Sequence, residues 1–200
     1  MIITKTPYRI SFFGGGSDYP SWYKKFGGSV LSTTIDKYIY ISCRELPPFF
    51  DHKYRIVWSK IENVKKINEI KHLTVRKLIK YNKIRSGLEI HYDGDLPARS
   101  GMGSSSSFSV GLMRALNYHQ HRDIKGINLA YKTIIFEQKI MKETVGSQDQ
   151  VAASVGGFNK INFLKNDKIL IKKILNNNLK KLNSNLLLLY TGIQRNADAV

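Results

Sequence analysis

The chain has 200 residues, enough for one domain of ordinary size or for one domain and part of another. With 42% hydrophobic and 24% charged residues, it has a globular composition that excludes disorder as the default state. The single cysteine, Cys43, excludes an internal disulfide framework and favours a reducing, cytoplasmic setting. No apolar run approaches the roughly 18 residues of a membrane span, so we expect no membrane partner.

In chain order, the hydrophobic pattern predicts a strand over residues 2–13, a glycine turn at 14–16, strands over 28–43 and 54–58, a helix over 61–82, a strand over 88–92, helices over 105–118, 127–143 and 149–155, and strands over 158–164, 168–174 and 186–190. Asparagines 176–178 form only a turn in this scheme. Because strands and helices do not alternate regularly, the α+β class is favoured.

The net charge of +17 has two interpretations, a nucleic-acid partner or a lysine-rich composition combined with an anionic substrate. The lysines are scattered from Lys24 to Lys181, often beside Asn and Ile. The sequence has no zinc finger, recognition helix or RNA-binding signature. We therefore expect no nucleic-acid partner.

A loop rich in Gly and Ser, PARSGMGSSSS at residues 97–107, lies between a predicted strand and a predicted helix. Small residues let a backbone approach a bulky anion, and the free amides of a helix N-terminus bind it. No Gly-Lys-Ser/Thr follows, so this is not a Walker A loop. The alternative is a flexible connector with a serine N-cap. The candidate phosphate-binding residues are Pro97, Arg99, Ser100, Gly101, Met102, Gly103, Ser104, Ser105 and Ser106.

Two carboxylates follow this loop. Glu137 shares one helix face with Ala130, Ile134 and Met141, so it is either a magnesium ligand or a helix-edge residue that reaches solvent. Asp149, twelve residues later, can cap the short helix that follows, and this role does not exclude another one.

The loop resembles the Pro-x-x-x-Gly-Leu-Gly-Ser-Ser loop of the GHMP kinases, with Met102 in place of the usual leucine. Residues 7–20, PYRISFFGGGSDYP, resemble the first motif of that family. The resemblance implies ATP and Mg²⁺ as cofactors, and it implies an acceptor base at Asp149. Arg9 would hold Asp149 ionised or grip a substrate phosphate. Mg²⁺ would be held by Ser105 and Glu137, and the sugar would be contacted by Asp18, Gly15, Gly16 and Ser17.

Within that family, Arg-Ile-Ser-Phe-x-Gly-Gly-Gly-Ser-Asp-Tyr, Gly-Ser-Gln-Asp-Gln and the stretch Tyr190–Ala197 most resemble bacterial D-glycero-D-manno-heptose 7-phosphate kinases. Fucokinase-type and galactokinase-type enzymes share much of the pattern. The implied partners are a small sugar phosphate and ATP. A non-catalytic nucleotide-binding module remains the alternative of another class.

The resemblance also implies a fold and a domain division. It predicts a GHMP-kinase N-terminal domain of the ribosomal protein S5 domain 2-like fold over residues 1–185. Residues 186–200 would begin a second domain that is largely missing, because family members are longer. We therefore expect the phosphate loop to be present and the active site to be incomplete.

Two further pairs of residues have structural interpretations as alternatives to functional ones. His119 and His121 end a predicted helix, where a favourable interaction with the helix dipole is the alternative to metal binding. Tyr54 and Trp58 either flank an adenine site or pack in the core.

Overall fold

The protein folds as one seven-stranded sheet with helices against it. This computed structural model describes residues 1–98, 100–175, 179–189, 191 and 192. The strands are β1 (Ile2–Phe13), β2 (Gly28–Glu45), β3 (Tyr54–Val57), β4 (Ile61–Val64), β5 (Leu88–Gly94), β6 (Phe158–Phe163) and β7 (Ile169–Lys173). The helices are α1 (Pro20–Phe26), α2 (Leu73–Tyr81), α3 (Ser104–His119), α4 (Gly126–Ile135), α5 (Gln148–Val155) and α6 (Leu179–Ser184). A 3₁₀ turn, η1 (Ile67–Glu69), precedes α2, and a π-helical turn, η2 (Phe136–Met141), continues α4.

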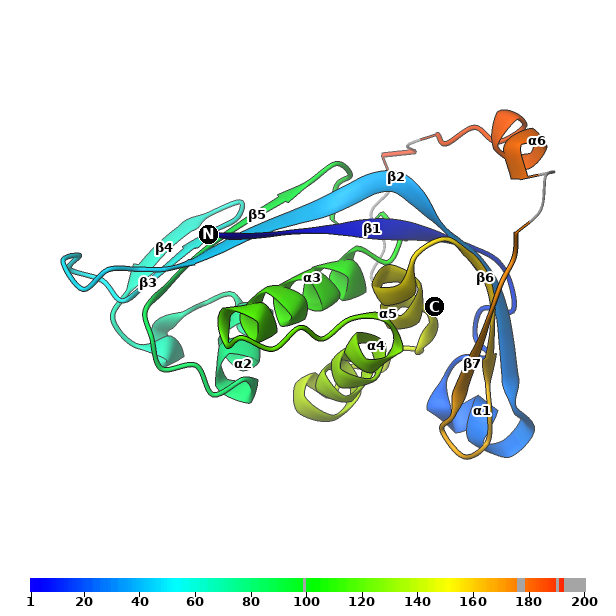
Figure 1. Cartoon of the computed structure of the whole chain (residues 1–200), viewed down its shortest axis with the longest axis horizontal. Coiled ribbons are helices and arrows are strands. Elements are labelled where there is room, and N and C mark those ends of the chain that lie inside the picture. Colours follow the sequence, from blue (N-terminus) through cyan, green and yellow to red (C-terminus); the bar gives the residue numbers. More distant parts are fainter. Residues whose placement is uncertain (99, 176–178, 190, 193–200) are drawn as a thin grey trace.

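The strand order is β4-β3-β5-β2-β6-β7, and β1 pairs with β2 outside this path. Helices α2 to α5 lie along one face of the sheet (Figure 1). The predicted α+β class is confirmed. The long strand β2 pairs with β1 along its length, with β6 through residues 28–33 and with β5 through residues 39–45.

Two clusters of buried side chains fill the space between the sheet and the helices. In the large cluster, Ile39, Ile41 and Ile90 from the sheet meet Leu112 and Leu116 of α3. Burying each side chain of this size contributes roughly 1.5–3 kcal/mol. The small cluster, toward α1 and β6, consists of Tyr23, Val30, Ala130, Ile134, Val151, Ile161 and Phe163.

Helix α3 lies unusually close to β1 because Gly111 has no side chain. A Cβ at Gly111 would lie 2.7 Å from Thr6 Oγ1, and Thr4 donates its hydroxyl to the Gly111 carbonyl at 3.2 Å. This close packing fixes the start of α3 relative to β1, the strand that carries Arg9.

The predicted helix over residues 61–82 is wrong in its first part. Residues 61–64 form strand β4, which pairs with β3 as a hairpin, and only Leu73–Tyr81 is α-helical. The apolar spacing that suggested a helix also fits an edge strand with Ile61 exposed and Glu62 turned inward. The Glu62 carboxylate accepts hydrogen bonds from Trp58 Nε1 at 3.0 Å and from the backbone amides of Lys71 and His72, which fixes the turn.

The predicted strand over residues 186–190 is also wrong in the part that the structure describes. Residues 186–189 form no strand, and Leu187 is 82% exposed, whereas α6 precedes them without having been predicted. Asparagines 176–178 lie outside the described residues, as do Tyr190 and residues 193–197 of the stretch Tyr190–Ala197. The domain boundary at residues 185 and 186 stays a prediction.

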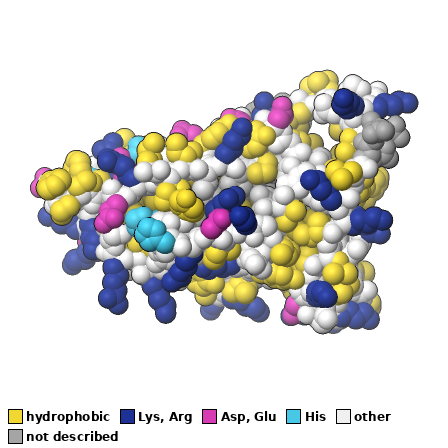
Figure 2. Space-filling view, in the orientation of Figure 1, with side chains coloured by type: hydrophobic (Ala, Val, Ile, Leu, Met, Phe, Trp, Pro, Cys, Tyr) yellow, Lys and Arg dark blue, Asp and Glu magenta, His cyan; other side chains and the backbone are white. Residues whose placement is uncertain are grey.

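The charged residues are dispersed over the surface. Figure 2 shows Lys and Arg side chains from one end of the visible face to the other, with apolar side chains between them. Among the described residues, no helix combines the length and the apolar character needed to cross a bilayer.

Candidate active site

The Gly/Ser loop connects β5 to α3, as predicted, and its backbone takes conformations that favour glycine. Gly101 has φ +75° and Gly103 has φ +73°, and Gly103 is the N-cap residue of α3. As a glycine, Gly103 has no side chain to cap this helix end, and the positive end of the α3 dipole lies at the loop. Arg99 lies outside the described residues.

Arg9 and Asp149 form a two-pronged ion pair against this loop. Arg9 Nε lies 2.5 Å from Asp149 Oδ1, and Arg9 Nη2 donates to Asp149 Oδ2 at 2.8 Å. Arg9 Nη1 also donates to the Gly101 carbonyl at 3.0 Å, and the Arg9 amide donates to the Met102 carbonyl at 3.2 Å. A Cβ at Gly103 would lie 3.2 Å from Asp149 Oδ2. The carboxylate of Asp149 therefore sits directly beside the start of α3.

The expectation that Asp149 caps a helix is wrong. Helix α5 begins at Gln148, and Asp149 lies in its first turn. The cap role belongs to Asp18, whose Oδ2 accepts from the Gln148 amide at 3.0 Å. Asp18 is fully buried and also accepts from the Gly16 amide at 3.1 Å. Burial is the main reason that the pKa of Asp18 is raised, with the nearby charge of Asp149 adding to it and the Gln148 amide opposing it.

The glycine turn after β1 is held in place by Asp18 and Ser17. The Ser17 hydroxyl donates to the Gly14 carbonyl at 2.7 Å. Gly15 and Gly16 are exposed, and a Cβ at Gly16 would meet no heavy atom within 4 Å. The part of this turn that offers open space is therefore its backbone, whereas the Asp18 carboxylate faces inward.

Glu137 lies under the start of α3, in the π-helical turn η2. It is 1% exposed, and its Oε2 accepts from the Ser106 hydroxyl at 2.9 Å and from the amide of Gln150. Its other oxygen, Oε1, is buried without a hydrogen-bond partner. The alternative that Glu137 reaches solvent is excluded. Ser105 is exposed, so it is Ser106 whose hydroxyl meets Glu137.

Burial raises the pKa of Glu137 to about 7, while hydrogen bonds from Ser109, Gln150 and Ser106 act in the opposite direction. A nearby cation stabilises the ionised form of a carboxylate that is buried in this way. Mg²⁺ prefers oxygen ligands and usually needs one or two carboxylates together with substrate phosphates. The unpartnered Oε1 and the neighbouring serine hydroxyls fit that ion.

The structure thus brings together Arg9, Asp149, Glu137 and the loop from Gly101 to Ser106. Sequence reasoning missed Gln150 and the partnership of Ser106 with Glu137. The only signal for Gln150 was its place next to Asp149, one residue along the same helix.

The other candidates take structural places. Tyr54 is buried in the large cluster, and Trp58 packs at its edge against His72. His119 ends α3 and lies 3.0 Å from the Ser86 hydroxyl through Nε2. Cys43 is buried in β2, as predicted. Among the described residues, no group of three or more His, Cys, Asp or Glu side chains is arranged to hold a metal ion.

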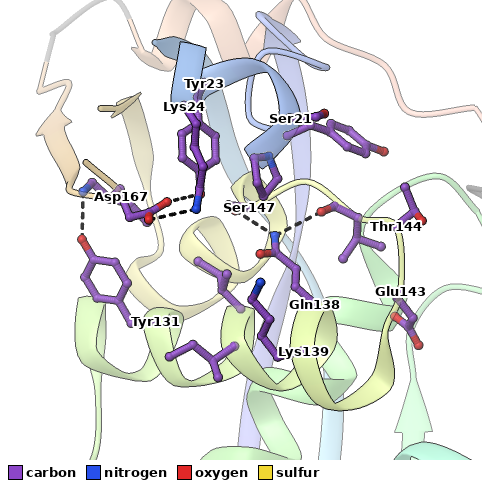
Figure 3. Close-up of a pocket in the computed structure, with 16 residues that line it drawn as sticks. Ser21, Tyr23, Lys24, Tyr131, Gln138, Lys139, Glu143, Thr144, Ser147 and Asp167 are labelled. Carbon is purple, nitrogen blue, oxygen red and sulfur yellow. Dashed lines mark hydrogen bonds and ion pairs between the residues drawn. The ribbon is translucent and has the colours of Figure 1, made fainter. Parts of the chain in front are cut away.

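A cavity of about 460 Å³ lies elsewhere, between α1, the helix α4–η2 and the β6–β7 hairpin (Figure 3). Tyr23, Lys24 and Asp167 interact across one end, and Gln138 donates to the Val145 carbonyl and the Ser147 hydroxyl at the other. None of its described lining residues is a predicted site residue, so we place the chemistry at the α3 N-terminus instead.

Comparisons with known proteins agree with this geometry. Residues 66–157 match the family model described as the GHMP kinases N-terminal domain. D-glycero-alpha-D-manno-heptose 7-phosphate kinase of Campylobacter jejuni is 30% identical over 98% of this chain and 61% of its own length. Galactokinase of Pyrococcus furiosus is 26% identical over 82% of this chain and 46% of its own length. The chain thus spans less than two thirds of these relatives.

Solved structures show the same fold. A D-glycero-D-manno-heptose 1-phosphate kinase from Bacteroides thetaiotaomicron aligns with a TM-score of 0.78 at 24% identity, over 88% of this chain and 60% of that one. Mevalonate kinase of Methanococcus jannaschii aligns with a TM-score of 0.63 at 21% identity, over 88% of this chain and 56% of that one. The predicted GHMP-kinase N-terminal fold is confirmed, and residues 66–157 of the chain are similar to the N-terminal domain of the GHMP kinases.

Proposed function

We propose that the protein is an ATP-dependent kinase that phosphorylates a hydroxyl of a sugar or sugar phosphate. One observation carries the proposal: two acidic side chains from different helices meet at the same helix N-terminus, beside a glycine- and serine-rich loop. Asp149 lies beside Gly103, and Glu137 accepts from Ser106 three residues further along. A passive phosphate-binding loop has no need of either carboxylate.

The phosphates of ATP would lie on the loop from Gly101 to Ser106. Its glycines allow close approach, and the positive dipole end of α3 favours an anion. Pro97, Arg99, Ser100 and Met102 complete the binding loop in this proposal. The Met102 carbonyl is already held by the Arg9 amide, so the loop is tied to β1 before a ligand arrives.

Mg²⁺ would be held by Glu137 and by a serine at the start of α3, for which Ser105 is the candidate because its exposed hydroxyl can reach a phosphate-bound ion. When bound, the ion supplies charge neutralisation for the phosphates of ATP. Glu137 contributes a buried carboxylate that the surrounding side chains already hold in one orientation.

Asp149 would accept the proton of the acceptor hydroxyl. As this O–H bond breaks, the hydroxyl oxygen forms a bond to the γ-phosphorus and ADP leaves, so the step is a direct in-line transfer. Arg9 orients Asp149 through two hydrogen bonds, so the carboxylate is held in one position for the proton transfer.

The acceptor would bind against the turn formed by Gly15, Gly16 and Ser17. Asp18, being fully buried, supports this turn from within, and the backbone of the turn faces the open space. The net charge of +17 would attract a phosphorylated sugar. This assignment favours a sugar phosphate over a neutral sugar.

The acceptor we propose is D-glycero-D-manno-heptose 7-phosphate, which would become the 1,7-bisphosphate in the synthesis of nucleotide-activated heptose for surface polysaccharide. The support is the 30% identity to the kinase of Campylobacter jejuni over almost the whole chain. A cytoplasmic setting suits an enzyme that uses ATP and contains a single, buried thiol.

ADP release by a chain that also carries the expected second domain, measured with ATP, Mg²⁺ and a panel of acceptors, tests the proposal. We expect release with the heptose 7-phosphate to exceed release with galactose, fucose or unphosphorylated heptose. Nucleotide binding without ADP release above the acceptor-free rate, for every acceptor, would favour a non-catalytic nucleotide-binding module instead.

A further inference from the structure

Glu137 joins three segments that are far apart in the sequence. Its carboxylate lies in η2, the Ser106 hydroxyl comes from the first turn of α3, and the Gln150 amide comes from the first turn of α5. Asp149, next to Gln150, belongs to the same turn of α5. Glu137 is therefore tied to the phosphate loop on one side and to the helix of the candidate base on the other.

Two of the hydrogen bonds that Glu137 accepts converge on one oxygen. Both Ser106 and Gln150 donate to Glu137 Oε2, whereas Oε1 is buried without a partner. The amide oxygen of Gln150 is also buried without a partner, and Gln150 itself is 0% exposed. A buried acceptor left unpaired is costly, so an arrangement that leaves two of them together is unusual in a purely structural network.

From this geometry we propose that Ser106 and Gln150 are positioning residues for Glu137. They occupy one carboxylate oxygen and so fix the direction of the other, the oxygen that would bind Mg²⁺ with the nucleotide. The inference rests on the proposed function. Outer partners of a metal ligand typically change metal affinity by about 10- to 100-fold when they are removed.

The burial of Ser106 supports the inference. A side chain without a hydroxyl at this position would have nothing to donate to Glu137. Here the hydroxyl is buried, with Ser106 only 5% exposed, and it lies 2.9 Å from the carboxylate. The serine is accommodated because Glu137 offers it an acceptor.

Isothermal titration of the 200-residue chain with ATP, in MgCl₂ and separately in EDTA, tests the proposal. We expect Ser106→Ala and Gln150→Met to weaken binding of Mg·ATP by about 10-fold or more and to leave magnesium-free ATP within about 2-fold. Excess Mg²⁺ is expected to restore most of the lost affinity, which a merely structural defect would not allow.

Thr133→Val is the matched control. It removes a buried hydroxyl one turn before Glu137 that donates to the Leu129 carbonyl at 2.9 Å and does not touch the carboxylate. We expect it to leave the magnesium dependence unchanged. Thermal unfolding of each variant identifies those that are folded, and Ser106→Ala, the smaller change, keeps the test valid if Gln150→Met unfolds.

The outcomes separate the two proposals. If the unaltered chain binds Mg·ATP more tightly than ATP in EDTA and both variants do the same to an equal extent, the positioning role is overturned and the proposed function stands. If the unaltered chain shows no magnesium-dependent binding of ATP, the proposed function is overturned and this inference with it.

Discussion

The surroundings of Glu137 and of Asp149 show two ways of holding a carboxylate at one helix N-terminus. Glu137 is 1% exposed and receives hydrogen bonds from neutral side chains, and its pKa is raised to about 7 by burial. The Asp149 side chain is 23% exposed and faces the guanidinium of Arg9 through two hydrogen bonds. Among the described residues, Glu137 has no positively charged hydrogen-bond partner, whereas Asp149 already has one in Arg9.

This difference in surroundings indicates which role suits each carboxylate. A buried carboxylate held by neutral donors gains most when a cation arrives, because the cation compensates the desolvation of its charge. A carboxylate that already shares its charge with Arg9 gains less from a second cation, but its position is well defined. Its position and its partial exposure suit it to receive a proton.

We expect the largest effect, on turnover, from removing the carboxylate of Asp149. In Asp149→Asn the amide cannot accept the proton of the acceptor. In a chain that also carries the expected second domain, turnover should therefore fall by about 10²- to 10⁴-fold. The affinity for ATP should change little, because the phosphates would lie on the loop. Steady-state ADP release and nucleotide titration measure the two separately, and unchanged turnover would reject the base assignment.

The next largest effect is the contribution of Glu137 to the unfolding free energy, which depends on pH. Because the folded pKa is about 7 and the unfolded value is 4.5, the folded state keeps its proton over the range in which the unfolded state loses it. The contribution of Glu137 to the unfolding free energy is therefore complete below pH 4.5 and is lost as the pH rises through 7. The loss amounts to roughly 3 kcal/mol at most.

Glu137→Gln isolates this contribution, since an amide of nearly the same shape does not titrate. Urea unfolding at several pH values between 4.5 and 8 should show a stability that falls less steeply with pH in the variant than in the unaltered chain. Parallel curves for the two proteins would contradict a raised pKa at Glu137.

We expect a smaller effect on stability from Gly103→Ala, which disturbs the ion pair of Asp149 and Arg9 but not Glu137. Gly103 has φ +73°, and a Cβ there would lie 3.2 Å from Asp149 Oδ2 and 3.3 Å from Arg9 Cγ. We expect a loss of about 1–2 kcal/mol of unfolding free energy. The pH dependence of the unfolding free energy that Glu137 causes should persist in this variant. Its disappearance would show that the surroundings of Glu137 and of Asp149 are coupled.

Much of the fold follows from local patterns. Alternating residues in β1 and β2 and the apolar face of α3 predicted these elements, because burial against one layer leaves a regular trace in the sequence. The hairpin of β3 and β4 was missed, since four residues with apolar ends fit a helix and a strand equally well. Pairing with β3, a tertiary contact, decided the outcome.

For the candidate site, the sequence predicted which residues take part but not how they contact one another. The Gly/Ser loop, Arg9, Glu137 and Asp149 follow from composition and spacing together with a family resemblance. Their partners do not, because the side on which Glu137 faces depends on the π-helical turn η2 and on how α5 packs beside α3. The inward direction of Asp18 likewise follows from its contact with the start of α5, which no local pattern reveals.

Strand β2 has a consequence for how the molecule comes apart. It supplies Val30 to the small cluster and Ile39 and Ile41 to the large one, while β1 follows it along its whole length. Neither half of the sheet can open without rupturing the same strand, so both halves melt in one cooperative transition. Amide hydrogens in the middle of this strand would accordingly exchange with deuterium only through global unfolding, and they would report on the stability of the entire fold.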